Sequence, residues 1–270
     1  YAKVAARHAQ GELEKQRLPI TAARENAFKT DWASYTPPKP TFLGTKVFES
    51  YDLHELARYI DWTPFFQAWE MKGRFPAVLD DPVQGAAARQ LWEDAQAMLA
   101  EVLQKNWFRP KAVIGFWPAN SVGDDIELFT DDSRAEPLAT FFTLRQQLSK
   151  QKEKPNLALA DFVAPTGTPD YIGGFVVTAG LEEHLIADRF ARQNDDFSSI
   201  LIKALGDRFA EALAEVMHER VRKEFWGYAK DEAVPIDELI HEKYQGIRPA
   251  PGYPAQPDHT EKTTLFRLLN

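Results

Sequence analysis

One long amphipathic segment, 198–226, constrains the fold of this chain more than any other feature. Its apolar side chains recur every three or four positions and therefore share one face of a helix. These residues are Leu201, Leu205, Phe209, Leu213 and Val216. At 1.5 Å per residue the segment predicts a helix roughly 40 Å long. Its composition is too mixed for a coiled coil, so the helix should pack inside a globular domain.

A second helix is predicted over 85–105, where apolar residues again recur at helical spacing. Its apolar stripe needs a partner surface, and we expect that surface to be a sheet. Four short apolar or alternating segments bounded by Pro, Gly or Asp predict strands. They are 111–117, 125–129, 157–163 and 171–178. Segment 138–148 fits either a strand or a helix, because periodicity alone does not decide.

This order of elements predicts an α+β fold, one domain with a central, mainly antiparallel twisted sheet flanked by helices. Before the sheet we expect a short strand at 46–49 and a helix that begins at Asp52 and ends near Asp61. The helix should stop there because Thr63 precedes a proline. After the long helix, Pro235 should start a short helix. Gly173 and Gly174 suggest a bulge or a close backbone approach.

Residues 1–40 are polar and end in three prolines within four residues, which predicts a linker or wrapping arm. The remainder, 41–270, should form the single domain. The chain begins at Tyr1 without an initiator Met, which is expected of a piece of a larger protein.

Composition excludes several classes of function. The chain carries 32 Lys and Arg against 40 Asp and Glu, a net charge of −8, which argues against nucleic-acid binding. With no cysteine it forms no disulfide and no thiolate metal site, which fits a reducing cytoplasm. No apolar run approaches the ~20 residues of a membrane span. The lack of such a run predicts no membrane partner. The six histidines show no metal-ligand spacing, so we expect no metal site.

An acidic stretch, 124–132, offers one alternative function. Its five carboxylates are Asp124, Asp125, Glu127, Asp131 and Asp132. Hard divalent cations prefer such oxygen ligands, which would suit a metal-dependent hydrolase. The spacing matches no calcium loop, however, and solvated strand ends are the favoured interpretation.

The most informative local feature is the loop that contains Arg248. Pro249 and Pro251 restrict the backbone on either side of Ala250 and so hold the cation at low entropic cost. An arginine grips a carboxylate with two parallel hydrogen bonds, and Tyr253 could lay an aromatic face beside a ligand. The alternative is a surface loop in which Arg248 makes a structural ion pair.

Three carboxylates are further candidates. Asp61, placed at the expected end of a helix, would oppose the helix dipole, so it either binds a ligand amine or caps the following turn. The turn is favoured on local grounds. Glu211 falls away from the apolar stripe and is expected to face solvent, whereas Glu242 lies six residues before Arg248. The aromatic residues Trp62, Phe65, Phe66 and Trp69 are expected in the core.

Several segments, in chain order, resemble one family. They are RYIDWTPFF, WPANSVGDDIELF, LRQQ, LADFVAP, DYIGGFVVTAGLEE, HERVRK, WGYA and YQGIRPAPGYPAQPDHTEK. Over about 45–270 the chain looks like the activation (S-adenosylmethionine-binding) domain of cobalamin-dependent methionine synthase, a methyltransferase of methionine and amino-acid biosynthesis. Residues 1–40 resemble the linker from its cobalamin-binding module. The family's domain continues beyond the HTEK segment, so we expect a C-terminal continuation to be lacking here.

The resemblance implies a role in reactivation. The domain would bind S-adenosylmethionine and dock on cobalamin held by the neighbouring module. Reductive methylation would then return cob(II)alamin to methylcobalamin, with an electron from flavodoxin or an equivalent donor. Without the family's thiolate zinc site, the chain alone should not perform the full reaction, and none of its residues is expected to be catalytic. The alternative is a docking module that binds the cobalamin domain or another protein through the proline-rich loop, without S-adenosylmethionine.

Carried over by motif, Asp61 would receive the α-amino group of the ligand and Arg248 its carboxylate. Ala250 would contribute backbone contacts and Tyr253 would lie near the ligand. Glu242 and Glu211 would add charge near the site. For an acidic electron donor, a basic patch at Arg220, Arg222 and Lys223 is the expected contact.

Overall fold

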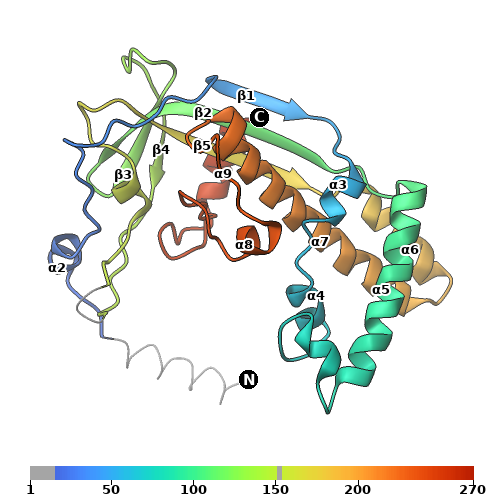
Figure 1. Ribbon diagram of the computed structural model, residues 1–270. Helices are drawn as coiled ribbons and strands as arrows, with labels where there is room; N and C mark the ends of the chain where they lie inside the picture. Colours follow the sequence, from blue (N-terminus) through green and yellow to red (C-terminus); the bar gives the residue numbers. More distant parts are fainter. Residues whose placement is uncertain (1–15, 151–153) are drawn as a thin grey trace. The chain divides into compact units, whose positions relative to one another are not determined.

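The structure, a computed structural model, describes residues 16–150 and 154–270 and contains a five-stranded sheet (Figure 1). The strands are β1 (Gly44–Phe48), β2 (Lys111–Val122), β3 (Asp125–Phe129), β4 (Pro137–Phe142) and β5 (Asp170–Thr178). The order is β1-β2-β3-β4, and β5 pairs with β2. The β2–β3 and β3–β4 pairs are antiparallel. The predicted α+β class is confirmed.

Helices precede, interrupt and follow the sheet. The α-helices are α2 (Ile20–Glu25), α3 (Leu53–Ala57), α4 (Thr63–Ala68), α5 (Gly85–Lys105), α6 (Glu182–Arg192), α7 (Asp196–Arg220), α8 (Ile236–Ile240) and α9 (Glu261–Leu269). The chain also contains two short 3₁₀ turns, η1 (Ala77–Asp80) and η2 (Leu159–Phe162). A π-helical turn, η3 (Val221–Phe225), follows α7 directly. Together α7 and η3 account for the long helix predicted over 198–226.

The chain forms two compact units. The first contains described residues up to 44, together with 115–174 and 247–270, and the second contains 45–114 and 175–246. The described part of the predicted arm therefore belongs to the first unit. Pro37 and Pro40 are buried, so the prolines of the arm have contacts within the folded chain.

The second unit is built around α7, the long orange helix of Figure 1, against which α3, α4, α5 and α6 pack. The predicted apolar stripe is its core face, and Leu205, Phe209 and Leu213 are fully buried. Asp195 caps α7 by accepting a hydrogen bond from Ser198 N at 3.0 Å. The predicted stripe on 85–105 was also correct, since Leu91, Ala95 and Val102 of α5 are buried.

The first unit contains the antiparallel β3–β4 pair, with α9 against β4. Gly174 lies where a Cβ would stand 2.6 Å from Leu265 Cδ1, closer than atoms can pack. The close approach expected at this glycine is made by a side chain and not by another backbone segment. Because α9 is nine residues long and contains two adjacent threonines, its apolar spacing is weak and the sequence did not reveal it.

The structure corrects one predicted strand and decides a segment that the sequence left open. Segment 157–163 is not a strand but contains η2, because Asp161 Oδ2 accepts a hydrogen bond from Ala158 N at 3.0 Å and closes a local turn. Segment 138–148 is a strand only as far as Phe142, the end of β4.

The first helix also differs from its prediction. It ends at Ala57, and α4, which was not predicted, begins at Thr63. A proline in the first turn, Pro64, helps to start α4. Helix α6 was missed too, because only Ile186 and Ala187 are buried on it and so narrow a stripe gives little periodicity. Within the part of the chain that the structure describes, no helix has the length and apolar character needed to cross a membrane.

Candidate functional site

The backbone around Arg248 is closed on itself. Tyr253 N donates to Ala250 O at 3.0 Å, and Gly252 N donates to Gln256 O at 2.8 Å. Gln256 is only 4% exposed, and its backbone N donates to Tyr253 O at 2.9 Å. The loop is therefore a defined structure, as the flanking prolines predict, and not a loose connection.

Gly252 is essential to this turn. Its φ is +109°, a region that side-chain-bearing residues avoid, and a Cβ there would collide with the imidazole of His259. The segment after the turn is fixed as well, because Asp258 Oδ1 accepts a hydrogen bond from Thr260 N at 2.8 Å. Both constraints reduce the number of conformations available to the loop.

The loop presents an aromatic ring and a cation. Tyr253 is 62% exposed, Ala250 is exposed and Arg248 is half-buried. A half-buried arginine on a braced backbone suits recognition of a carboxylate, and an exposed ring suits stacking. The structure thus brings Arg248, Ala250 and Tyr253 together on one loop of the first unit.

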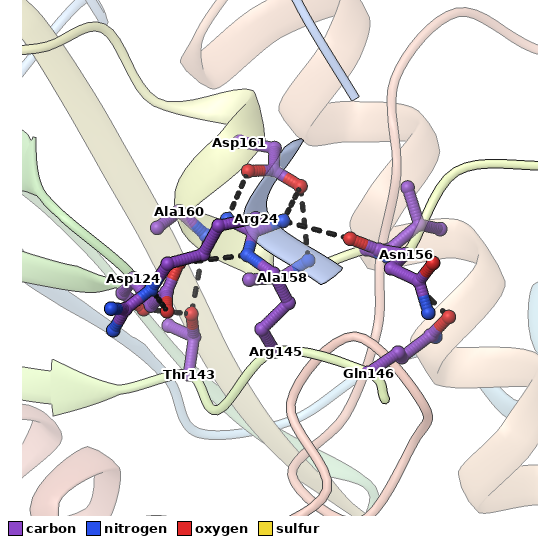
Figure 2. Close-up of polar contacts among 10 residues, drawn as sticks. Arg24, Asp124, Thr143, Arg145, Gln146, Asn156, Ala158, Ala160 and Asp161 are labelled. Atoms are coloured by element: carbon purple, nitrogen blue, oxygen red, sulfur yellow. Dashed lines mark hydrogen bonds and ion pairs between the residues drawn. The ribbon is translucent and has the colours of Figure 1, made fainter. Parts of the chain in front are cut away.

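A hydrogen bond ties the loop to η2. Leu159 N donates to Ala255 O at 2.8 Å. Arg145 holds η2 through two hydrogen bonds to Asp161 (Figure 2). Its Nη2 donates to Asp161 Oδ1 at 2.6 Å, and its Nη1 donates to Asp161 Oδ2 at 2.8 Å. Both side chains are almost fully buried. Hydrogen bonds from its guanidinium to Asp161, the largest effect, raise the pKa of Arg145, although burial acts to lower it.

Asp61 lies in the second unit, between α3 and α4. Its Oδ1 accepts a hydrogen bond from Thr63 N at 2.8 Å, so the carboxylate caps the turn into α4. The favoured turn interpretation is confirmed. The expected position at the end of a helix was wrong, and the electrostatics are reversed, because a carboxylate before a helix N-terminus is stabilised. Asp61 is half-buried.

The aromatic residues beside Asp61 form a cluster of ring contacts. The rings of Trp62 and Trp92 meet edge to face at 4.7 Å, and those of Phe65 and Phe66 at 5.4 Å. Phe65 and Phe66 are buried, as expected of a core cluster, whereas Trp62 and Trp69 are half-buried.

Glu211 and Glu242 lie on two further elements of the second unit. Glu211 is exposed on α7, as the helical wheel predicts. Glu242 follows α8, is exposed, and has a left-handed φ of 56°. Asp61, Glu211 and Glu242 thus stand on three separate elements.

Two of the five carboxylates in the acidic stretch, Asp124 and Asp132, pair with cations, which corrects the favoured interpretation for these two, whereas Asp131 is exposed. Asp124 Oδ2 accepts from Arg24 Nε at 2.8 Å and its Oδ1 from Arg145 Nε at 2.8 Å. Burial acts to raise the pKa of Asp124, but the hydrogen bonds from Arg24 and Arg145 outweigh it and hold that pKa below its usual value.

Asp132, in the same stretch, pairs with Lys39 and accepts from Tyr171 Oη at 2.9 Å. Among residues 16–150 and 154–270 no three His, Asp or Glu side chains gather as metal ligands. The metal-hydrolase alternative has no support in this part of the chain.

The expected basic patch at the end of α7 is wrong. Arg222 is completely buried, its Nη2 donates to Glu232 Oε1 at 2.6 Å, and its guanidinium lies 4.1 Å from the centre of the Tyr244 ring. Arg220 pairs with Glu224, and Lys223 Nζ lies 3.3 Å from Glu219 Oε1. The last two pairs have i,i+4 spacing and could have been predicted from the sequence, whereas the partners of Arg222 could not.

Sequence reasoning assigned no role to Arg145, Asp161 or Asn156, although the first two lie in the LRQQ and LADFVAP segments. A partial signal was available, because Asp161 stands among apolar residues in 157–163 and a carboxylate buried there is expected to pair. The pairing partner, however, depends on long-range packing.

Taken together, these elements define an α+β fold with a braced loop that carries Arg248 and Tyr253. Residues 52–270 match the family described as vitamin B12 dependent methionine synthase, activation domain. A solved structure, the crystal structure of the MetH reactivation domain bound to AdoHcy, is 50% identical with a TM-score of 0.88. The likeness covers 94% of this chain and 78% of that chain.

The match spans well over half of the chain. The chain therefore belongs to the family of activation domains of vitamin B12 dependent methionine synthase, as its sequence segments suggested. By family it is part of a methyltransferase of methionine biosynthesis.

Proposed function

We propose that this chain is the reactivation module of a cobalamin-dependent methionine synthase. It binds S-adenosylmethionine and docks on the cobalamin of the neighbouring module for the reductive methylation of cob(II)alamin to methylcobalamin. One observation carries the proposal: a 50% identical relative with the same fold is bound to AdoHcy, which is S-adenosylmethionine without its methyl group.

The residues present fit such a ligand. Its amino-acid part is a zwitterion, which needs one anion and one cation, and both Asp61 and Arg248 are half-buried groups of the required charge. We propose that Asp61 receives the α-amino group while it keeps its bond to Thr63 N, and that Arg248 binds the carboxylate. Partial burial strengthens both charge-assisted bonds.

The remaining site residues have supporting roles. Ala250 offers its backbone to the ligand, and the exposed ring of Tyr253 packs beside it. Glu242 and Glu211 add negative charge to the surroundings of a positively charged sulfonium. None of the six residues transfers a group itself: the protein binds and orients, which is the usual contribution of a protein to cofactor chemistry.

The ligand's sulfonium and the cobalt supply the methyl-transfer chemistry, and the electron comes from flavodoxin or an equivalent donor. We propose that residues 1–40 are the arm from the cobalamin-binding module and that 41–270 form the activation domain. The whole enzyme would act in the cytoplasm, where free thiols and reduced electron carriers persist.

The direct test is a reactivation assay with the enzyme that contains this chain. Oxidised enzyme is supplied with a reductant and S-adenosylmethionine, and the absorption spectrum of its cobalamin is followed. We expect the methylcobalamin spectrum only when both are present. Docking without use of S-adenosylmethionine would leave the cobalamin reduced but unmethylated, and that result would favour the alternative of a pure docking module.

A further inference from the structure

Arg145 is the centre of a buried polar network in the first unit (Figure 2). Its side chain is 3% exposed and bonds to three partners: Asp124 Oδ1 at 2.8 Å, Asp161 Oδ1 at 2.6 Å and Asn156 O at 2.7 Å. Breaking such a buried set is costly, because each group left without its partner stays desolvated. The network should therefore restrict the movement of the segments that are bonded to it.

One branch of the network leads to the Arg248 loop. Asp161 is part of η2, where its carboxylate also accepts from Ala158 N at 3.0 Å. Leu159, which follows Ala158 in the chain, donates from its backbone N to Ala255 O at 2.8 Å. Ala255 lies two residues after Tyr253, inside the turn that carries the proposed ligand contacts. Arg145 thus supports this loop without touching it.

The other two branches lead to the arm. Arg24 Nε donates to Asp124 Oδ2 at 2.8 Å, on the carboxylate that Arg145 also uses. Asn26 Nδ2 donates to Asn156 Oδ1 at 2.7 Å, and Asn156 N donates to Asn26 O at 2.9 Å. Nearby, the rings of Phe28 and Phe162 stack at 5.0 Å, so the arm also packs directly on η2.

We propose that Arg145 is a positioning residue for the Arg248 loop and that attachment of the arm at Arg24 and Asn26 supports the same network. Attachment of the arm and affinity for the ligand are then coupled, because a change in the arm alters the Arg248 loop. The ligand part of this inference rests on the proposed function, whereas the structural coupling does not.

The chain offers a closely matched pair of variants. Arg24 and Lys39 are both arm residues, 58% and 56% exposed, and each pairs with one aspartate, Asp124 and Asp132 respectively. Only Arg24 reaches the Arg145 network. Both cations are more than half exposed, so Arg24→Ala and Lys39→Ala should both fold.

The first measurement is amide hydrogen exchange in the ligand-free protein, read at Leu159 N, the donor to Ala255 O. Arg24→Ala should raise its exchange rate about threefold or more, and Lys39→Ala should leave it unchanged. Equal protection in wild type and both variants would overturn the coupling, whether or not the chain binds S-adenosylmethionine.

The second measurement is calorimetric titration with S-adenosylmethionine. Arg24→Ala should weaken binding about three- to tenfold, the usual range for coupling through a packed network, and Lys39→Ala should not. In an Arg248→Ala background the effect of Arg24→Ala should vanish. An equal loss in both backgrounds would show that the arm does not act through the loop and would overturn the inference. Absence of binding by wild type would instead contradict the proposed function.

Discussion

The carboxylate of Asp61 accepts a hydrogen bond from the backbone N of Thr63 at 2.8 Å, so the residue proposed to bind the ligand's amine already has a structural task. The two tasks need different properties of the side chain. Capping needs an oxygen acceptor, which an asparagine also supplies, whereas binding an ammonium group needs the negative charge.

We therefore expect Asp61→Asn to separate the two roles. The cap is retained, so the free energy of unfolding should change by less than about 0.5 kcal/mol, because Asn and Asp cap equally well. Affinity for S-adenosylmethionine should fall about tenfold, since a charge-assisted bond becomes a neutral one. Urea unfolding and calorimetry check the two parts. Reduced stability with unchanged affinity would mean that Asp61 is only a cap.

Arg248→Ala should weaken binding by about ten- to a hundredfold, because it removes the bonds to the carboxylate of the ligand. A suitable control is Arg192→Ala, at an exposed arginine in the last turn of α6. The control removes the same charge from the chain elsewhere and should leave the dissociation constant unchanged. Equal affinities of the two variants would show that Arg248 is not a ligand contact.

The Arg145 network predicts a sensitivity to acid. The pKa of Asp124 in the folded chain lies below the usual value of 3.8, so the unfolded chain takes up this proton first as the pH falls. The stability that Asp124 contributes is complete above pH ~4 and is lost as the pH falls through the folded pKa.

Asp124→Asn should be less stable than wild type at pH 6, and the difference should shrink on acidification from pH 5 towards pH 3. Burial raises the pKa of Asp170 and of Glu261, so their contributions to stability depend on acid with the opposite sign. Because both proteins contain these two residues, the difference in their free energies of unfolding reports on Asp124. Urea unfolding at several pH values measures it. A constant difference across this range would contradict an ionised, paired Asp124.

Local chemistry predicted much of the fold. Regular spacing along α5 and α7 identified both long helices, and Pro, Gly and Asp boundaries identified β2, β3 and β5. The errors lie where long-range contacts determine the local structure. Segment 157–163 has the apolar composition of a strand, but Asp161 turns inward to Arg145 and closes η2 instead.

The candidate site shows the same division. The prolines around Ala250 predicted a braced loop, and the structure confirms it through the Tyr253 N to Ala250 O bond. The roles of Asp61 and Arg248 came from the family resemblance, because neither spacing nor charge indicates a zwitterionic ligand. The prediction of a basic patch was wrong because Arg222 is buried against Glu232 and Tyr244, and no local sequence pattern indicates those partners.

Calorimetric titration of S-adenosylmethionine into the wild-type chain, repeated with AdoHcy, tests the central claim most directly. We expect saturable binding of one ligand per chain, and a melting temperature that rises with ligand concentration because the ligand binds only the folded state. No heat of binding and an unchanged melting temperature at millimolar ligand would contradict the account.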